Sequence, residues 1–198
     1  MEIIMLDAAN DQVTMMPELV ILVDEDDVAI GYDEKLAVHR SGALHRAFSV
    51  IVFNSHGEML MQQRALTKYH SGGLWSNTCC GHPRPEESTI AAAHRRLREE
   101  MSITCELVHE GSFMYHARLN AELIEHEYDH VVVGFCDGSP APDADEVMDW
   151  RWIEFQRALA SVAAQPEIYT AWLPLVLARV TGDAARIHRE SSVPAATV

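Results

Sequence analysis

The sequence predicts a mixed α/β fold, formed as a single domain over residues 1–198. Runs rich in β-branched and aromatic residues, such as 47–54, are typical of strands, and the apolar periodicity of 85–101 is typical of a helix. With 48% hydrophobic and 23% charged residues, a chain of 198 residues can bury a full core. No internal repeat or linker divides it.

The elements can be placed in chain order from periodicity and turn residues. We expect a weakly ordered leader at 1–17, a short strand at 20–23, a turn at 24–27, a loop or short helical segment at 35–45, strands at 47–54 and 59–64 around a hairpin turn at 55–58, a helix at 85–101, strands at 112–118, 128–136 and 147–153, a loop at 137–142, and two helices within 155–179 broken near Pro166 and ended by Gly182. The residues after Glu190 are expected to be poorly ordered.

The helix at 85–101 carries one apolar stripe and one anomaly. Pro85 is placed near its start, and the stripe repeats at helical spacing. Its members are Ile90, Ala93, Leu97 and Met101. Glu99 and Glu100 lie at the end where the helix dipole disfavours acidic groups, so a role other than helix stability is expected for them.

Composition excludes several classes of function. No apolar run approaches the roughly 20 residues of a membrane span, and the start lacks the basic region of a signal peptide, so a cytoplasmic protein is expected. The four cysteines form no Cys-x-x-Cys pair and are expected to be free thiols. A net charge of −15 argues against nucleic-acid partners but permits a phosphorylated metabolite.

The segment 73–83 brings a thiol and an imidazole together. Cys80 and His82 lie two residues apart beside Gly81 and Pro83, which predicts a tight loop between two regular elements. Such a thiol serves as a nucleophile, an acid/base, a metal ligand or a packed side chain. The motif alone leaves these roles open.

Paired carboxylates and histidines offer a metal site. In an extended segment, Glu125 and Glu127 point to one face and His126 to the other, although for Glu-x-Glu alone an exposed strand end is the favoured interpretation. With His39, His45 and His82 they form a His3Glu2 set suited to Mn²⁺, Zn²⁺ or Mg²⁺. Four other histidines are expected at the surface: His56, His70, His94 and His188.

Three cations lie nearest in sequence to these candidate site residues: Lys35, Arg64 and Lys68. The chain has only 15 Lys and Arg in all. Their grouping suggests binding of a phosphorylated substrate, against an ordinary surface role for each one taken separately.

The run 81–103 resembles the Nudix box, a loop and helix that project carboxylates onto a divalent metal beside a diphosphate. A solvated helix with pairs such as Arg95–Glu99 is the simpler alternative. Two departures stand out: Arg96 replaces a glutamate, and Ser102 replaces a glycine. The resemblance therefore implies a Nudix fold, with a central mixed β-sheet flanked by helices, whose hydrolytic machinery is altered.

Over residues 20–175 the chain resembles the type I isopentenyl-diphosphate isomerases, a branch of the Nudix superfamily. The matching stretches are 44–49, 63–68, 75–83, 125–127 and 145–150. The resemblance implies interconversion of isopentenyl and dimethylallyl diphosphate, in which one group protonates the alkene and another removes a proton from the neighbouring carbon of a tertiary carbocation.

The resemblance also assigns residues to roles. Cys80, Glu127 and Tyr115 match catalytic positions; His39, His45, His82, Glu125 and Glu127 match ligands of one divalent metal; Glu100 matches a Mg²⁺ position at the substrate diphosphate; Lys35, Arg64, Lys68 and Arg96 match its cations; and Trp172 matches an aromatic that stabilises the carbocation. Cys79, Cys105 and Cys136 are taken as structural. A monomer or weak dimer is expected. A Nudix pyrophosphohydrolase and a noncatalytic metal-binding module remain the competing hypotheses.

Overall fold

The computed structural model describes residues 4–5, 14–15 and 17–180. Its strands are β1 (Ile4–Met5), β2 (Thr14–Met15), β3 (Leu19–Val23), β4 (Ala29–Glu34), β5 (His45–Phe53), β6 (Glu58–Arg64), β7 (Trp75–Ser76), β8 (Cys79–Gly81), β9 (Leu107–Arg118), β10 (Ile124–Phe135) and β11 (Val147–Glu154). Its helices are α1 (Lys35–Ser41), α2 (Thr89–Met101), α3 (Phe155–Ala164), the 3₁₀ turn η1 (Pro166–Ile168) and α4 (Leu173–Arg179).

A mixed sheet forms the centre of the molecule, with the order β11-β6-β5-β10-β9. The pair β5–β10 is parallel, whereas β9 and β6 run antiparallel to their neighbours. The strand pair β3–β4 and the short strands β7 and β8 extend this sheet. The expected central mixed sheet flanked by helices is confirmed.

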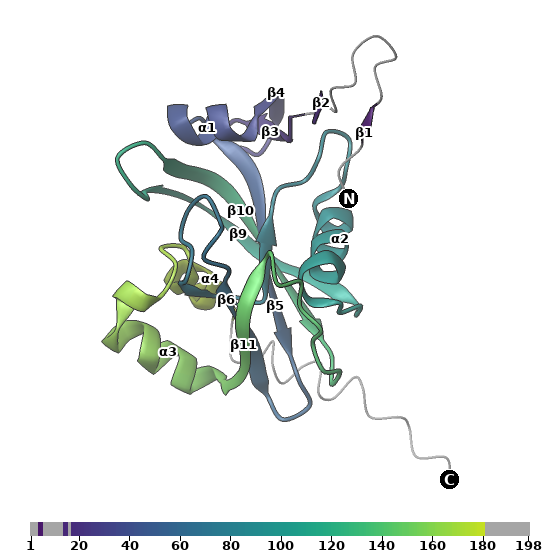
Figure 1. The fold of residues 1–198 in the computed structure, drawn as a ribbon, viewed down its shortest axis with the longest axis vertical. Coiled ribbons are helices and arrows are strands. Elements are labelled where there is room, and N and C mark those ends of the chain that lie inside the picture. Colours follow the sequence, from purple (N-terminus) through teal and green to yellow (C-terminus); the bar gives the residue numbers. More distant parts are fainter. Residues whose placement is uncertain (1–3, 6–13, 16, 181–198) are drawn as a thin grey trace.

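Helices cover both faces of the sheet, with α2 on one side and α3 and α4 on the other (Figure 1). Successive side chains of β5 point to opposite faces of the sheet, so they pack against different helices. Val50 and Val52 pack toward Leu97 of α2, whereas Ile51 and Phe53 pack toward the side of α3 and α4. Because both faces are buried, β5 is almost continuously apolar in sequence.

Helix α2 begins at Thr89, not near Pro85 as the sequence suggested. Glu86 has a positive φ of 66°, and the extended Ser88 accepts a hydrogen bond from the backbone nitrogen of Ala91, so Ser88 is the N-cap. The expected apolar stripe is confirmed, with Leu97 fully buried.

Ser102 ends α2 in the left-handed conformation, with a φ of 55°. A glycine adopts that conformation without strain, which explains why the Nudix box carries one there. The Ser102 hydroxyl donates to the carbonyl of Ala141 over 2.7 Å, a bond that offsets part of the cost.

The sequence missed several extended segments. β4 and the full length of β9 and β10 were not predicted, and Cys80 lies in the short strand β8 rather than on a tight loop. The break of the last helices at Pro166 is confirmed. Most of the predicted leader, Gly182 and the tail after Glu190 fall outside the described residues. None of the described helices is long and apolar enough to cross a membrane.

Candidate functional site

Strand register places three predicted site residues in one row. Glu127 of β10 lies opposite His45 in the parallel pair with β5, and opposite Tyr115 in the antiparallel pair with β9. Residues directly opposite across strands share a face and lie within contact distance. The Tyr115 hydroxyl donates to Glu127 Oε2 over 2.6 Å, and His45 Nε2 lies 3.7 Å from Glu127 Oε1.

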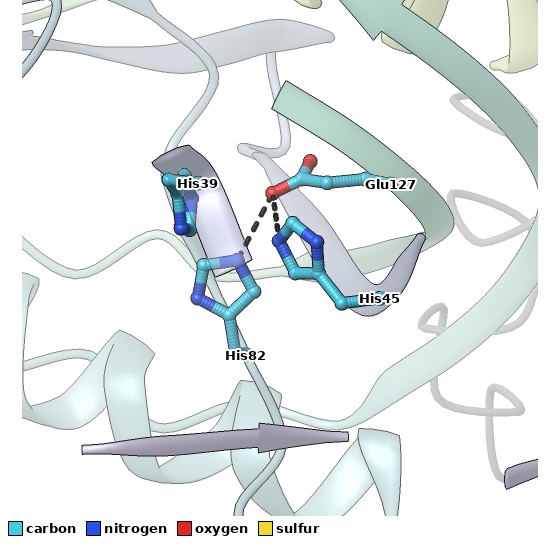
Figure 2. A group of neighbouring side chains, drawn as sticks. All are labelled: His39, His45, His82 and Glu127. Carbon is cyan, nitrogen blue, oxygen red and sulfur yellow. Dashed lines mark hydrogen bonds and ion pairs between the residues drawn. The ribbon is translucent and has the colours of Figure 1, made fainter. Parts of the chain in front are cut away.

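Two further histidines complete a compact cluster on this row. His82, just after β8, places its Nε2 3.0 Å from Glu127 Oε1, and His39 comes from α1. Figure 2 shows His45 and His82 both approaching the same carboxylate oxygen of Glu127, with His39 beside them. Glu125, two residues earlier on the same face of β10, lies 3.2 Å from His39 Nε2. The predicted His3Glu2 set is thus brought together.

The donor atoms of the cluster fit a divalent cation. His39 Nδ1 bonds the carbonyl of Lys35 over 2.6 Å, and His45 Nδ1 bonds that of Ala43 over 2.9 Å, so each Nε2 carries a lone pair. The Tyr69 hydroxyl lies 3.3 Å from His39 Nε2. Among the described residues, His45 Nε2 and Glu125 Oε2 are buried without a hydrogen-bond partner. Buried acceptors that face one another are repulsive unless a cation lies between them. A nitrogen and carboxylate set suits Mn²⁺, Zn²⁺ or Mg²⁺.

The pKa values of the two carboxylates in the cluster are shifted in opposite directions. Burial raises the pKa of Glu125 well above its ordinary value, and the nearby charge of Glu127 adds to this. Burial also acts on Glu127, but its contacts with His45 and His82 outweigh it and hold the pKa of Glu127 well below the ordinary value. Glu127 is therefore the ionised member of the pair.

Cys80 lies one strand away from this row. Strand β8 pairs Cys80 with Ser49 of β5, and the Ser49 hydroxyl donates to Asp129 of β10 over 2.8 Å. The Cys80 thiol donates to Oδ1 of Asn77 over 3.2 Å. Burial, reinforced by the charge of Asp129, raises the pKa of Cys80 to about 12, so the thiol keeps its proton at neutral pH.

Asn77 links the thiol to the predicted aromatic residue. Its Oδ1 accepts from the Cys80 thiol, from Trp172 Nε1 over 3.2 Å and from the hydroxyl of Ser76 over 3.1 Å. Its side-chain amide donates to the carbonyls of Val50 and Cys79. One fully buried side chain thus fixes both the thiol and the indole.

The predicted cations line the same cavity, and three of them have carboxylate partners. Lys35 pairs with Glu18 over 3.0 Å. Lys68 and Arg96 both bond Glu146, and these contacts overcome the effect of burial to hold the pKa of Glu146 at about 2. The guanidinium of Arg64 lies 5.5 Å from the ring centre of Trp172, and its buried Nε has no hydrogen-bond partner among the described residues.

Glu100 is buried, and its carboxylate is already engaged. Arg96 donates to Glu100 Oε1, and Gln62 donates to Oε2 over 3.1 Å. The neighbouring Glu99 is one of the residues that line the cavity. The two acidic residues at the end of α2 therefore hold Arg96 from two sides, which explains their position at the unfavourable end of the helix dipole.

A cavity of about 1420 Å³ lies beside these groups, although Asn77 and Glu100 do not line it. Predicted site residues along its wall are Lys35, Arg64, Lys68, Cys80, His82, Arg96, Tyr115, Glu125, Glu127 and Trp172. His39 and His45 lie fully buried behind them. Cys79 is also fully buried, in agreement with a packing role, and all four cysteines are free.

Sequence reasoning placed His70 at the surface, and this was wrong. His70 is only 9% exposed, and its Nε2 lies 3.2 Å from Glu125 Oε1. No periodicity marks a histidine in the loop between β6 and β7, so the sequence carried no signal for it. Asp129 was also missed, although it continues the alternation of Glu125 and Glu127 along β10, which was a usable signal.

Solved structures share this fold. The crystal structure of DR0079 from Deinococcus radiodurans matches with a TM-score of 0.69 at 20% identity, covering 82% of this chain and 98% of that one. The MutT protein from Methanosarcina mazei matches with a TM-score of 0.57 at 18% identity, covering 76% of this chain and 96% of that one. At these identities the likeness concerns the fold alone.

Closer relatives identify the family. The NUDIX domain family matches residues 43–173. The isopentenyl-diphosphate Delta-isomerase 2 of Aromatoleum aromaticum is 52% identical, over 83% of this chain and 87% of its own length. The isopentenyl-diphosphate Delta-isomerase of Burkholderia multivorans is 53% identical, over 83% and 93%. The chain therefore belongs to the isopentenyl-diphosphate Delta-isomerases of the NUDIX family.

Proposed function

We propose that this protein is an isopentenyl-diphosphate isomerase, which interconverts isopentenyl diphosphate and dimethylallyl diphosphate for isoprenoid synthesis. The observation that carries the proposal is a single cavity that holds a protonated thiol, an ionised carboxylate and a set of cations. The family membership of the chain supports the same reaction. Moving a double bond by one carbon needs an acid and a base at neighbouring carbons, together with an anchor for the diphosphate.

Cys80 and Glu127 are the proposed acid/base pair. Protonation of the terminal alkene carbon gives a tertiary cation, and loss of a proton from the neighbouring carbon restores a double bond. The proton gained and the proton lost balance, so one group of the pair ends protonated and the other ionised. Because the reaction is reversible, the two groups exchange these states between the two directions.

Three residues position and protect the reacting centre in this proposal. The Tyr115 hydroxyl holds Glu127 by its Oε2, and Asn77 holds the Cys80 thiol. Trp172, 4% exposed, presents an aromatic ring that favours a nearby carbocation and excludes water that would capture it. All three act without taking a proton themselves.

Two cation sites belong to the proposal. His39, His45, His82, Glu125 and Glu127 would hold one divalent ion, Mn²⁺, Zn²⁺ or Mg²⁺, whose charge favours the ionised form of Glu127. A Mg²⁺ ion would accompany the diphosphate near Glu100, with Lys35, Arg64, Lys68 and Arg96 around it. The engaged carboxylate of Glu100 means that Arg96 must move toward the substrate before Glu100 reaches that ion.

Proton NMR of isopentenyl diphosphate with Mg²⁺ in D₂O tests the proposal. Wild type should form deuterated dimethylallyl diphosphate, and Cys80→Ala and Glu127→Gln should each lose about 10²-fold or more of the rate. Cys79→Ala, which alters the adjacent packed thiol, is the matched control and should stay active. Unchanged starting material with wild type would refute the isomerase, and release of phosphate or pyrophosphate would identify a hydrolase.

The hydrolase is the less favoured alternative because Arg96 occupies a carboxylate position of the Nudix box. A location in the cytoplasm and a monomer or weak dimer are also part of our proposal. Light scattering after gel filtration measures the second of these.

A further inference from the structure

His70 lies at the edge of the metal cluster without belonging to the predicted ligand set. It comes from the loop between β6 and β7 and is nearly buried. Its ring stacks on that of His39, with centroids 5.8 Å apart and planes 26° apart, and it meets Trp172 edge-on at 6.1 Å. The loop thus places an imidazole between the cluster and the cavity.

Two polar contacts of His70 define the orientation of its ring. His70 Nδ1 lies 3.2 Å from the hydroxyl of Ser71, and Nε2 lies 3.2 Å from Glu125 Oε1. When the hydroxyl donates to Nδ1, the ring proton sits on Nε2, the nitrogen that lies next to Glu125 Oε1. Both ring nitrogens are then used, and His70 has no lone pair to offer a metal ion.

Glu125 thus contacts His70 through one oxygen and His39 through the other. Oε1 lies 3.2 Å from His70 Nε2, and Oε2 lies 3.2 Å from His39 Nε2 without a hydrogen-bond partner among the described residues. His39 Nε2 carries a lone pair because its Nδ1 bonds the carbonyl of Lys35. Glu125 Oε2 and the lone pair of His39 Nε2, which the Tyr69 hydroxyl also approaches to 3.3 Å, therefore lie where both could bind one cation.

We propose that His70 is a positioning residue of the metal centre, which fixes Glu125 so that its Oε2 completes the ligand set. The inference rests on the proposed divalent metal but not on the isomerase reaction. Groups that hydrogen-bond a ligating carboxylate commonly contribute about 10- to 100-fold to metal affinity. The metal affinity of this protein would then depend on a residue outside the five proposed ligands.

Metal affinity in the absence of substrate tests the inference. Mn²⁺ is titrated into metal-free protein while free Mn²⁺ is followed by electron paramagnetic resonance. We expect His70→Leu to weaken Mn²⁺ binding by about 10- to 100-fold, because Glu125 loses its anchor. His70→Gln, whose amide N–H reaches a similar position, should restore most of the affinity. His56→Leu, the same substitution at an exposed turn, is the control and should bind as wild type.

Each other outcome overturns the inference. If His70→Leu binds Mn²⁺ as tightly as wild type, His70 does not position Glu125. Equal weakness of His70→Gln and His70→Leu would make His70 a direct ligand, since an amide supplies no imidazole lone pair. If His70→Leu does not fold, His70→Asn takes its place, because its shorter amide does not reach Glu125. Absence of Mn²⁺ binding to wild type would refute the metal centre, whereas isomerase failure alone leaves this test intact.

Discussion

A single buried amide, that of Asn77, connects the two groups that would act on the hydrocarbon part of a substrate. It binds the Cys80 thiol and the Trp172 indole through one oxygen, and it ties both to β5 through Val50. An alanine at this position leaves the indole N–H without a partner, at a cost of about 1–3 kcal/mol. The same loss frees the thiol to rotate away from the alkene.

We therefore expect Asn77→Ala to lower kcat by about 10- to 100-fold while the KM for isopentenyl diphosphate changes little. The cations that would bind the diphosphate make no hydrogen bond to Asn77, so substrate affinity should persist. Steady-state kinetics separates the two constants. Asn120→Ala, which removes a turn acceptor on the loop before β10, is the control. A raised KM with unchanged kcat would contradict this role.

The loop before β11 is tied to α2 and to the loop after β6 by one carboxylate. Glu146 bonds both Arg96 and Lys68, and these two contacts outweigh burial to hold its pKa at about 2, against an ordinary value of 4.5. A lowered folded-state pKa stabilises the protein above the unfolded value, and that stabilisation is lost as the pH falls toward the folded value. The tie should therefore weaken between pH 4.5 and about 2.

Urea unfolding at several pH values tests this tie. At pH 7 we expect Glu146→Gln to reduce the free energy of unfolding by about 2 kcal/mol, because the two cations lose their charged partner. The difference from wild type should shrink steadily from pH 5 to 2, as Glu146 itself becomes protonated. A difference that stays constant with pH would contradict the shifted pKa.

Helices and strands of this chain were predictable where their patterns are local. The β-branched run of β5 and the stripe of α2 follow from burial on one or both faces. The start of α2 was misplaced because the Ser88 cap, not Pro85, sets it.

His70 was misplaced because its partner, Glu125, lies 55 positions away (125 minus 70), and only the folded loop brings them together. The predicted ligand set came from the residue types and was matched by the family resemblance, whereas its geometry came from the register of β5 and β10.

The histidine and glutamate cluster draws on elements that are far apart in the sequence, from α1 to β10. His39 comes from α1, His45 from β5, His82 from the segment after β8 and Glu127 from β10. These residues are assembled only when the parallel pair β5–β10 forms, so the unfolded chain has no equivalent site. A ligand that binds only the folded state stabilises it by about 4 kcal/mol at a concentration 1,000 times its Kd.

We expect saturating Mn²⁺ to raise the Tm by roughly 2–4 °C for each kcal/mol of binding, and EDTA to abolish the rise. Differential scanning calorimetry measures both. His45→Ala should remove the Mn²⁺-dependent shift, whereas the surface substitution His56→Ala should preserve it. An equal shift in His45→Ala would place the ion elsewhere.

Glu146 also bears on how a reaction cycle would end. If Lys68 and Arg96 bind the substrate diphosphate, as proposed, its departure removes a negative charge from beside both cations. Here Glu146 already bonds both Lys68 and Arg96, so it is poised to take the place of the leaving anion as each contact breaks. In the proposed reaction Glu146 would therefore compete with the diphosphate for these two cations on entry and would favour its release.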